Sequence, residues 1–564
     1  MTLVSKAFSD IITFSRSSNA TRIGPTGLVE YAPHNLLLQS QTFDNASWTL
    51  VNAIITADAV AAPNGNITGD KVSETAVTGA FIVYEFVMPS GGTYTFSVYA
   101  KAAERTKFAL EFSSATPVAI FDLSAGTVSS TTDSTATITS VGNGWYRCSM
   151  TATLAAVSTS AISIRDASGN RSYAGTAGSG IYLWGAQLSV GPYPLDYTPT
   201  TSAAVYGPRF DYDPVTLAAR GLLVEEQRTN LVTWSDDFSN GSWIKGLATI
   251  SANSGTAPDG TQTADKLIPT AVSSADHGVY QITAASGVGV YTVSAFVKAA
   301  GYNFADIFDG YGSALITVDL TNGSYSVVGS PTATSVTAFG NGWYRVTITR
   351  TVSGVPAYIQ IRAQNDINRT AFTGDGTSGI YVWGAQSEQA SFATSYIPTI
   401  GTVTRSADVA SVNTLSPWFN ATEGTFFAEF DLLAASSVLA ASASPRVFSA
   451  HAGSTLTAMD ELIETNGAAF FGIDSGSGQW TISRTPAIAA ATTAKFAGAF
   501  KVNDIAAVLN NGSVGTDTSA TIPSVTTLQL ADRYGSDRSL NGHLRRIAYY
   551  PRRLQNAELQ ALTA

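Results

Sequence analysis

Apolar and polar residues alternate with a period of two along most of this chain. In YTFSVYAKA (94–102), every second residue from Tyr94 to Ala100 falls on one face, and the residues between them fall on the other. Such alternation predicts half-buried β-strands. Turn-forming strings such as Pro-Asn-Gly and Ser-Gly-Gly separate the strand-like runs, and we find no sustained 3.6-residue pattern in the first 400 residues. We therefore expect antiparallel two-sheet sandwiches of the jelly-roll type.

The chain also repeats itself at a spacing that grows from 195 to 199 residues. APNGNITGDK returns as APDGTQTADK, NGWYR returns unchanged, and IYLWGAQ (181–187) returns as IYVWGAQ (380–386). A slowly growing spacing is expected when a few residues are inserted in loops while the strands are kept. Two copies of one domain therefore cover residues 29–200 and 222–400.

Two segments without a clear period, 201–221 and 401–413, are expected to be linkers. Residues 1–28 lie outside every module, and we expect them to anchor the protein to a larger particle or to join subunits. The remainder, 414–564, is a different β domain, because its strand-like runs do not match the repeat.

This third domain contains its own local signals. GTFFAEFDLL (424–433) alternates with a period of two, so Phe426 and Phe430 share a face. Asn511-Gly512 lies between two strand-like runs and predicts a hairpin. The last residues predict a short helix with Asn556 as its N-cap.

Composition and charge exclude several classes of function. The chain is 45% hydrophobic and only 13% charged, with a net charge of −10, which disfavours binding to nucleic acid. No window approaches 18 uninterrupted apolar residues, and the N-terminus lacks the pattern of a signal peptide, so we expect neither membrane insertion nor a cleaved leader. The single cysteine, Cys148, is replaced by Val346 in the second copy and is expected to be a buried small residue.

Enzyme motifs are absent from the sequence. The four histidines lie far apart, without metal-ligand spacing. There is no G-x-S-x-G elbow and no phosphate-binding glycine loop. A glycosidase needs two carboxylates across a groove, and no acidic pair is distinguished from ordinary surface acids. We therefore expect a protein that is not an enzyme.

Four strings carry a resemblance to a known class of proteins: NLVTWSDDFSNGSW, GPRFDYDPVTLAARGLLVEEQRTN, SYIPTIGTVTRSADV and LNGHLRRIAYYPRRLQNAELQALT. They resemble the fibre and spike proteins of tailed bacteriophages and of phage-derived gene transfer agents. The two repeats resemble a head-spike-fibre domain that is similar to jelly-roll carbohydrate-binding modules. The third domain is similar to concanavalin A-like and laminin-G-like sandwiches.

The resemblance implies an all-β fold, with two tandem jelly-roll sandwiches followed by a concanavalin A/laminin-G-like sandwich. It implies a virion-surface head spike or tail fibre, made in the host cytoplasm, that binds host cell-surface polysaccharide without cleaving it. Other virion proteins would bind at the N-terminus. A homo-oligomer is expected, with a trimer as the leading hypothesis, although no coiled-coil heptads enforce one. A purely structural fibre or capsid-decorating protein is the second hypothesis, and a polysaccharide depolymerase is the third.

The best binding candidates are aromatic residues near polar ones in regions that differ between the two copies, because sugar rings stack on aromatic faces. AAGYNFADIFDGYGSA (299–314) offers three aromatic candidates, Tyr302, Phe304 and Tyr311, beside two acidic ones, Asp306 and Asp309. Its counterpart in the first copy offers Arg105, Lys107 and Glu111 instead. The alternative interpretation is that Phe304 and Phe308 are core residues of a strand.

Two further sets of candidates are weaker. Tyr99 beside Lys101, and Phe296 beside Lys298, occupy equivalent positions on the polar face of a strand; they either line a concave sheet or pack under a loop or a partner. In the loop DRYGSDR (532–538), the candidates are Arg533 and Tyr534, with a solvated turn as the alternative.

The repeated tryptophans are expected to be core residues with internally satisfied N–H groups, since domains that bind different ligands would vary their contact residues. This applies to Trp184 and Trp383 in the IYLWGAQ and IYVWGAQ strings. Asp70 and Asp265, repeated before a lysine, are candidate calcium ligands. Structural calcium is the one cofactor that the residues suggest.

Overall fold

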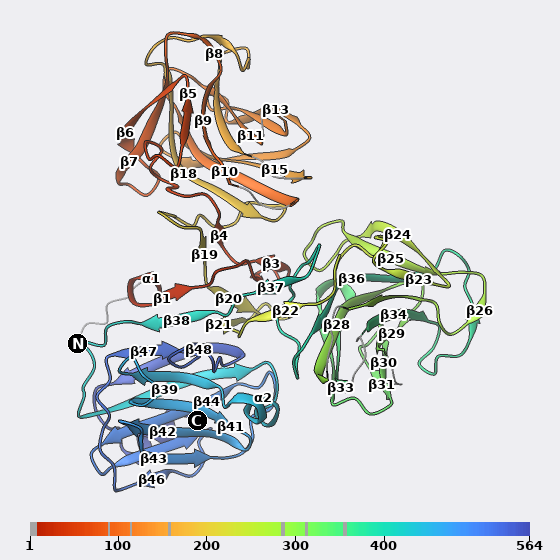
Figure 1. Ribbon diagram of the computed structural model, residues 1–564, viewed down its shortest axis with the longest axis vertical. Helices are drawn as coiled ribbons and strands as arrows, with labels where there is room; N and C mark the ends of the chain where they lie inside the picture. The colour runs from red at the N-terminus through yellow and green to blue at the C-terminus, as the bar shows by residue number, and fades with distance from the viewer. Residues whose placement is uncertain are drawn as a thin grey trace. The chain divides into compact units, whose positions relative to one another are not determined.

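A computed structural model describes most of the chain. The described residues are 8–87, 91–112, 116–155, 159–283, 288–310, 314–352 and 358–564. They form two compact units: Tyr31–Gly207, called here the repeat-1 unit, and Met1–Glu30 with Pro208–Ala564, called the main unit. Regular structure in both is overwhelmingly β-strand (Figure 1), which confirms the predicted all-β fold class. In the described part of the chain, no helix is both long and apolar enough to span a bilayer.

The repeat-1 unit is one sandwich of two six-stranded antiparallel sheets, the first sandwich. One sheet has the order β14-β15-β10-β18-β7-β6: β6 Ala53–Ala61, β7 Ile67–Glu74, β10 Gly92–Ala102, β14 Thr135–Gly142, β15 Trp145–Leu154 and β18 Gly180–Val190. The other has the order β13-β12-β11-β16-β9-β5: β5 Thr49–Val51, β9 Phe81–Glu85, β11 Lys107–Phe112, β12 Val118–Asp122, β13 Thr127–Thr132 and β16 Ser160–Arg165. Short pairs complete the unit: β4 His34–Asn35 with β19 Val205–Tyr206, and β8 Thr78–Gly79 with β17 Tyr173–Ala174.

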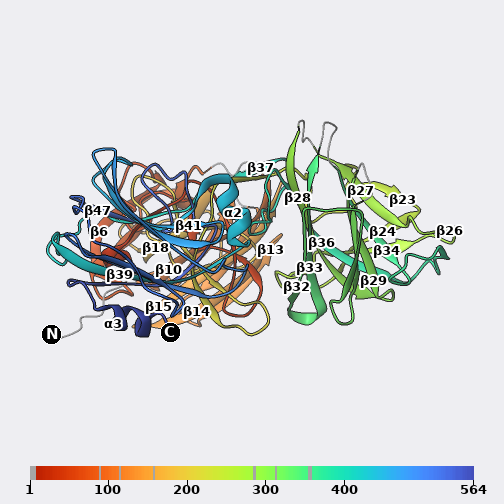
Figure 2. The same cartoon turned by 90° about the horizontal axis from the view of Figure 1, so that it is seen from below.

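The second sandwich repeats this arrangement within the main unit, and Figure 2 shows its two layers. One sheet has the order β24-β25-β36-β28-β33-β32: β24 Ala248–Gly255, β25 Ala264–Pro269, β28 Gly289–Ala300, β32 Ala333–Phe339, β33 Trp343–Val352 and β36 Gly379–Glu388. The other has the order β23-β27-β34-β29-β30-β31: β23 Ile244–Gly246, β27 Gly278–Ile282, β29 Phe304–Asp309, β30 Leu315–Asp319, β31 Tyr325–Val328 and β34 Tyr358–Gln364. Smaller elements are β22 Arg228–Asn230 with β37 Val403–Arg405, β26 Ser273–Ser274 with β35 Phe372–Thr373, and η1 Gly340–Gly342.

The third sandwich has two seven-stranded sheets. The first has the order β1-β38-β47-β40-β41-β42-β43: β1 Thr13–Ser15, β38 Val409–Val412, β40 Arg446–His451, β41 Ala458–Glu464, β42 Gly467–Asp474, β43 Ser477–Arg484 and β47 Thr527–Leu530. The second has the order β20-β21-β48-β39-β44-β45-β46: β20 Arg209–Tyr212, β21 Ala219–Val224, β39 Glu423–Leu432, β44 Ala494–Lys501, β45 Ile505–Leu509, β46 Gly515–Asp517 and β48 Gly542–Tyr550. The main unit also contains β2 Thr21–Ile23, paired with β3 Val29–Tyr31, whose last residue is the first of the repeat-1 unit, and the helices α1 Phe8–Ile11, α2 Ser436–Ala443 and α3 Asn556–Leu562.

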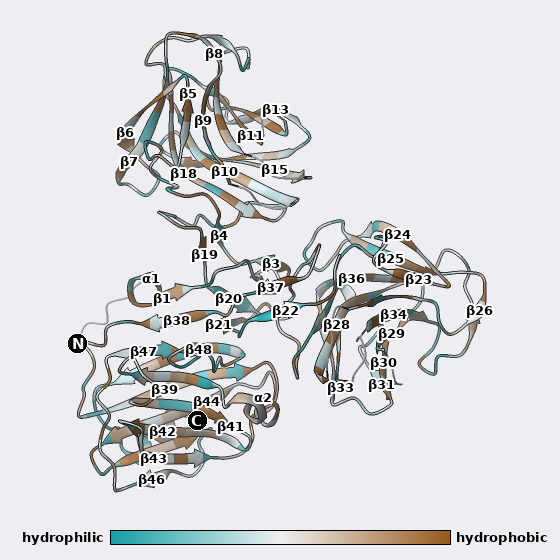
Figure 3. Ribbon diagram, in the orientation of Figure 1, coloured by the Kyte–Doolittle hydropathy of each residue, from teal (hydrophilic) through white to brown (hydrophobic). Residues whose placement is uncertain are grey.

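The alternation of the sequence is visible in the cores. Tyr94, Phe96 and Val98 of β10 all belong to the core of the first sandwich. Phe426 and Phe430 of β39 belong to the core of the third. Figure 3 shows hydrophobic stretches interspersed with polar ones along such strands. The predicted strand periodicity is therefore confirmed at these positions.

The two segments expected to be linkers contribute strands to the third sandwich instead. β20 and β21, in the stretch between the two repeats, add to the edge of β48, and β38, after the second repeat, lies between β1 and β47. Even β1, from the N-terminal segment expected to lie outside every module, is an edge strand of the third sandwich. These strands are short and pair over long sequence separations, so their own periodicity gives no signal.

A fully buried charge cluster holds these added segments together in the main unit. Arg209 donates to Glu225 (2.6 Å) and to Asp408, and Arg16 donates to Asp408 (2.8 Å). Arg405 donates to Glu225. All five side chains are fully buried. The N-terminal segment and both expected linkers therefore share one network of ion pairs.

Local predictions in the third sandwich are confirmed with two corrections. The hairpin at Asn511-Gly512 joins β45 to β46, but the residues with positive φ are Asn510 and Asn511 (47° and 55°). The C-terminal helix is α3, but its N-cap is Gln555, whose side chain forms a capping box with Glu558, because Asn556 is already the first helical residue.

Glu461 is a buried acid in the core of the third sandwich, and its replacement is expected to stabilise the protein. It lies on β41 between Phe448 and Phe470, fully buried, and both carboxyl oxygens lack a hydrogen-bond partner among the described residues. Burial raises the pKa of Glu461 well above its usual value of 4.5. The folded state therefore holds a proton that the unfolded state loses, so stability falls as pH rises above about 4.5.

We expect Glu461→Met to raise the free energy of unfolding by about 1–3 kcal/mol at pH 8 and by less at pH 5, because it removes an unsatisfied buried group. Urea unfolding at both pH values measures this. Glu464→Met, which removes a carboxyl group from a half-buried position on the same strand, is the control. An equal gain for Glu461→Met at both pH values would contradict the buried-acid explanation.

Candidate functional site

Aromatic rings gather on the outer face of one sheet of the second sandwich. Because Ile307 and Ile361 point into the core, the alternate residues of β29 and β34 point away from it. Tyr280, Phe308 and Tyr358 lie there, all half-buried, and are called here the aromatic platform. The ring of Tyr358 lies between the other two, with centroid distances of 5.9 Å to Tyr280 and 5.7 Å to Phe308.

Gly310 leaves the space that the ring of Tyr358 occupies. A Cβ atom at residue 310 would overlap the ring of Tyr358, so this ring lies directly against the backbone. The amide of Gly310 also donates to the carbonyl of Tyr358 (3.0 Å). A glycine directly after β29 therefore lets the platform form as a continuous surface across β27, β34 and β29.

A charged row runs beside the platform. The guanidinium of Arg362 lies 5.5 Å from the ring of Phe308 and 3.1 Å from the carboxylate of Asp306. Asp306 is fully buried and also accepts from Thr317 (2.7 Å) and Gln364 (2.8 Å). Burial raises the pKa of Asp306, and Arg362 opposes the shift. The three half-buried rings are tilted to one another by 58° and 61°, and the Arg362 guanidinium, held by the buried Asp306, lies beside them. Partly exposed rings next to a positioned polar group suit a polar ligand with an apolar face.

The other residues expected around strand 304–309 have different roles. Tyr302 packs on Phe372, with centroids 5.0 Å apart, and Phe304 is half-buried on the outer face. Asp309 is fully buried at the end of β29, with no hydrogen-bond partner among the described residues. Burial raises its pKa to about 6. Tyr311 lies outside the described residues.

Among the described residues of the first sandwich, the corresponding strand carries no such platform. There, Glu111 of β11 is fully buried and binds three groups: Ser163 (2.5 Å), Arg171 (3.1 Å) and Arg165. The divergence between the copies therefore replaces an ionic cluster with aromatic rings at the same place in the fold.

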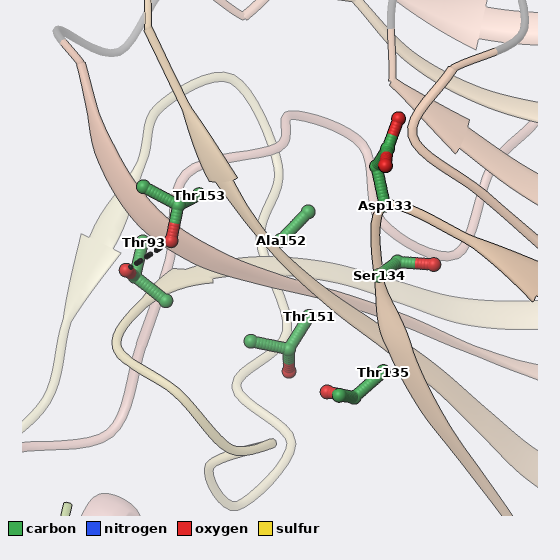
Figure 4. A pocket seen from close by; sticks show the side chains of 7 residues that line it. All are labelled: Thr93, Asp133, Ser134, Thr135, Thr151, Ala152 and Thr153. Atoms are coloured by element: carbon green, nitrogen blue, oxygen red, sulfur yellow. Dashed lines mark hydrogen bonds between the residues drawn. The ribbon is translucent and has the colours of Figure 1, made fainter. Parts of the chain in front are cut away.

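A shallow pocket lies elsewhere on the first sandwich, over β10, β14 and β15 (Figure 4). Its volume is about 400 Å³, and it is lined by Thr93, Asp133, Ser134, Thr135, Thr151, Ala152 and Thr153. Thr93 and Thr153 are hydrogen-bonded across the strands (2.9 Å). Its hydroxyl-rich lining has no aromatic ring on which a sugar could stack.

The predicted pair Tyr99 and Phe296 is used in packing. The ring of Tyr99 contacts Trp184 (5.3 Å) and Tyr197 (5.8 Å). Phe296 is only 1% exposed, so its face is not available to a ligand. Lys101 and Lys298 are half-buried beside them.

The repeated tryptophans are buried as predicted, but their N–H groups differ. Trp145 donates to Ala61 (3.0 Å) and Trp343 donates to Thr256 (3.2 Å). Trp184 and Trp383 lie in aromatic clusters on the outer face of a sheet, and their indole N–H groups have no partner among the described residues. The expectation that every N–H is satisfied is therefore wrong for this pair.

The two calcium candidates bind backbone amides. Asp70 accepts from the amides of Phe43 (2.8 Å) and Asp58 (3.0 Å). Asp265 accepts from those of Phe238 and Asn253 (both 2.8 Å). Each carboxylate thus fixes the position of a loop in its sandwich through hydrogen bonds to backbone amides. In the described part of the chain, no group of three His, Cys, Asp or Glu residues is suited to hold a metal ion.

Sequence reasoning missed Tyr280, Tyr358 and Arg362. The signal was present in AYIQIRAQ (357–364), where Ile359, Ile361 and Ala363 alternate with larger polar or aromatic residues. A tyrosine on the outward face of such a strand is a stronger ligand candidate than one in a repeated core string.

Comparison with known proteins finds distant structural similarity. No protein-family model and no curated protein matches the chain. Among solved structures, the CBM22-1–CBM22-2 tandem domain of Paenibacillus barcinonensis Xyn10C is 12% identical, with a TM-score of 0.23, covering 63% of this chain and 98% of that one. Mouse laminin alpha1 domains LG4-5 are 13% identical, with a TM-score of 0.19, covering 51% and 90%. The LG1-3 region of the laminin alpha2 chain is 10% identical, with a TM-score of 0.18, covering 86% and 98%.

Proposed function

We propose that this protein binds glycans without cleaving them, and that the aromatic platform of the second sandwich is a binding surface. The observation that carries the proposal is the placement of Tyr280, Phe308 and Tyr358 on an outer sheet face beside the Arg362–Asp306 pair. Pyranose rings stack on aromatic faces through their C–H groups, and their hydroxyls bond to fixed polar side chains. The platform offers both.

The resemblance in sequence supports a more specific role as a virion-surface adhesin that attaches a phage or phage-like particle to host cell-surface polysaccharide. A single platform of this size would bind weakly, at about millimolar affinity or roughly 4 kcal/mol. Several copies on one particle, as a trimer or larger oligomer, would convert this into firm attachment through effective concentration. The alternative is a structural fibre whose sandwiches serve only assembly, and the third is a depolymerase.

The test is adsorption of the purified chain to host cells that have or lack surface polysaccharide, together with an assay for released reducing ends. We expect binding that depends on the polysaccharide and no release. Tyr280→Ala combined with Tyr358→Ala should weaken adsorption at least tenfold, about 1.4 kcal/mol, because the stacking surface is lost. Tyr325→Ala, which removes a tyrosine that is 47% exposed at the edge of the same sheet, is the matched control.

Equal adsorption to both kinds of cell would favour the structural alternative. Release of reducing ends would favour the depolymerase. Unchanged adsorption of the double variant would show that the platform is not the binding surface.

A further inference from the structure

The outer face of the third sandwich carries a row of buried polar side chains. Gln529 of β47 and Asp460 of β41 both lie opposite Ser449 of β40, so the three residues form one row across adjacent strands. His451 lies two residues further along β40 on the same face. His451, Asp460 and Gln529 are called here the polar floor; their exposed fractions are 4%, 5% and 7%.

Each of these side chains has an unused hydrogen-bonding atom. His451 Nε2, Asp460 Oδ1 and Gln529 Nε2 are buried and have no partner among the described residues. His451 Nδ1 accepts from the amide of Gly453 (3.0 Å), so Nε2 carries the ring proton. Burial lowers the pKa of His451, which keeps the ring neutral. The polar floor therefore presents two donors and one acceptor, and unsatisfied buried groups of this kind call for a partner.

The loop 532–538, which follows β47 and contacts one end of the floor through Tyr534, is called here the flap. The ring of Tyr534 lies 5.2 Å from that of His451 and is 45% exposed. At the other end of β40, Arg538 donates to the carbonyl of Ala443 (2.6 Å), and its own carbonyl accepts from the amide of Arg446 (2.9 Å). The flap is thus attached near the start of β40 through Arg538. It places the exposed Tyr534 near His451, at the end of β40.

We propose that the polar floor and the flap form a binding site for an uncharged hydroxylated ligand, namely a saccharide unit. A hydroxyl both donates and accepts, so neighbouring hydroxyls can satisfy His451, Asp460 and Gln529 together, while Tyr534 supplies a stacking face. A metal ion does not fit, because the Nε2 atom of His451 carries a proton. The Oδ2 atom of Asp460 is already paired with Arg446 (2.8 Å), and its free Oδ1 atom needs a donor, which a deprotonated anion does not supply. Because the unpartnered atoms are buried and Tyr534 packs against His451, entry of the ligand requires the flap to move away from His451.

This site takes its ligand class from the proposed function but lies in a different sandwich from the aromatic platform. The test therefore uses the full-length chain in which Tyr280→Ala and Tyr358→Ala have removed the platform. Neutral hexaoses of glucose, mannose and galactose are the probes. Hydrogen exchange of the amides in 532–538 is the readout, and saturation-transfer NMR of each sugar reports binding separately.

We expect at least one hexaose to slow exchange in the flap at least fivefold. Tyr534→Ala and Gln529→Leu should each abolish this protection, whereas Tyr325→Ala should not. Because Tyr534 is exposed, its variant should fold normally, which keeps the test informative if Gln529→Leu is unstable. No flap protection by any hexaose would overturn the polar-floor site, even where the intact platform binds sugar. Protection that survives Tyr534→Ala and Gln529→Leu would overturn it as well. Flap protection without any platform-dependent adsorption would support this site and count against the platform.

Discussion

Replacing Asp408 with asparagine is expected to lower the free energy of unfolding of the main unit by about 3–5 kcal/mol, which is the typical cost of breaking a buried ion pair from one side. Asp408 accepts from Arg16 (2.8 Å) and from Arg209, and its carboxylate also accepts from the amide of Glu225 (3.0 Å). Without its charge, three fully buried arginines would face Glu225 alone.

The pKa values of the two carboxyl groups in the cluster also indicate that the cluster stabilises the folded state. Burial opposes ionisation of Glu225 and Asp408, but the neighbouring arginines outweigh it and hold both pKa values below their usual range. A carboxyl group with a lowered pKa contributes stability that is present above its unfolded pKa, here about 4, and that is lost as pH falls. Acid should therefore destabilise the wild type more than Asp408→Asn.

Urea-dependent hydrogen exchange read by mass spectrometry measures this prediction, because peptides from β21 and β38 report on the main unit and peptides from β10 report on the repeat-1 unit. The β10 peptides should be unchanged, since all five charged residues of the cluster belong to the main unit. Asp504→Asn is the matched control. It removes a half-exposed partner of Arg553 and should cost less than about 1 kcal/mol. A similar small loss for Asp408→Asn would show that the buried cluster adds no stability.

Much of the fold could be predicted because it is encoded locally. A period of two, repeated turn strings and a repeat of about 197 residues predict tandem sandwiches. Core positions such as Phe96 and Phe426 follow directly from alternation. The hairpin at Asn511 and the helix at the C-terminus also depend on neighbouring residues alone.

What could not be predicted depends on pairing between distant residues. Arg16 and Asp408 are 392 residues apart, and each lies in a segment where the sequence predicts no strand, so neither charge is expected to be buried. The aromatic platform also depends on pairing between distant residues, because Tyr280 and Tyr358 become neighbours only when β27 pairs with β34. The candidate string 299–314 did contain part of this face, Phe308 and Asp306, but their partners lie on strands that the composition of the string does not reveal.

The second large effect is expected at His543, where replacement by glutamine should destabilise the main unit by about 3 kcal/mol at pH 6 and by progressively less toward pH 10. The Nδ1 atom lies 2.6 Å from Asp431 and the Nε2 atom 2.8 Å from Asp211. Both nitrogens face carboxylate oxygens, so both must donate, and the ring is an imidazolium. Burial opposes this charge, but the two carboxylates outweigh it and raise the pKa of His543 to about 9.

The raised pKa of His543 makes the stability of the folded state depend on pH. A histidine whose pKa is raised from 6.5 to about 9 on folding contributes stability that is complete below pH 6.5 and is lost as pH rises through 9. At about 1.4 kcal/mol per pH unit, the full contribution is roughly 3 kcal/mol. Denaturant unfolding of wild type and His543→Gln at pH 6, 8 and 10 measures it, and using the difference between the two cancels the separate contribution of Glu461. A difference that stays constant from pH 6 to pH 10 would mean that His543 is neutral, and that Asp211 attaches β20 to the third sandwich through an ordinary hydrogen bond.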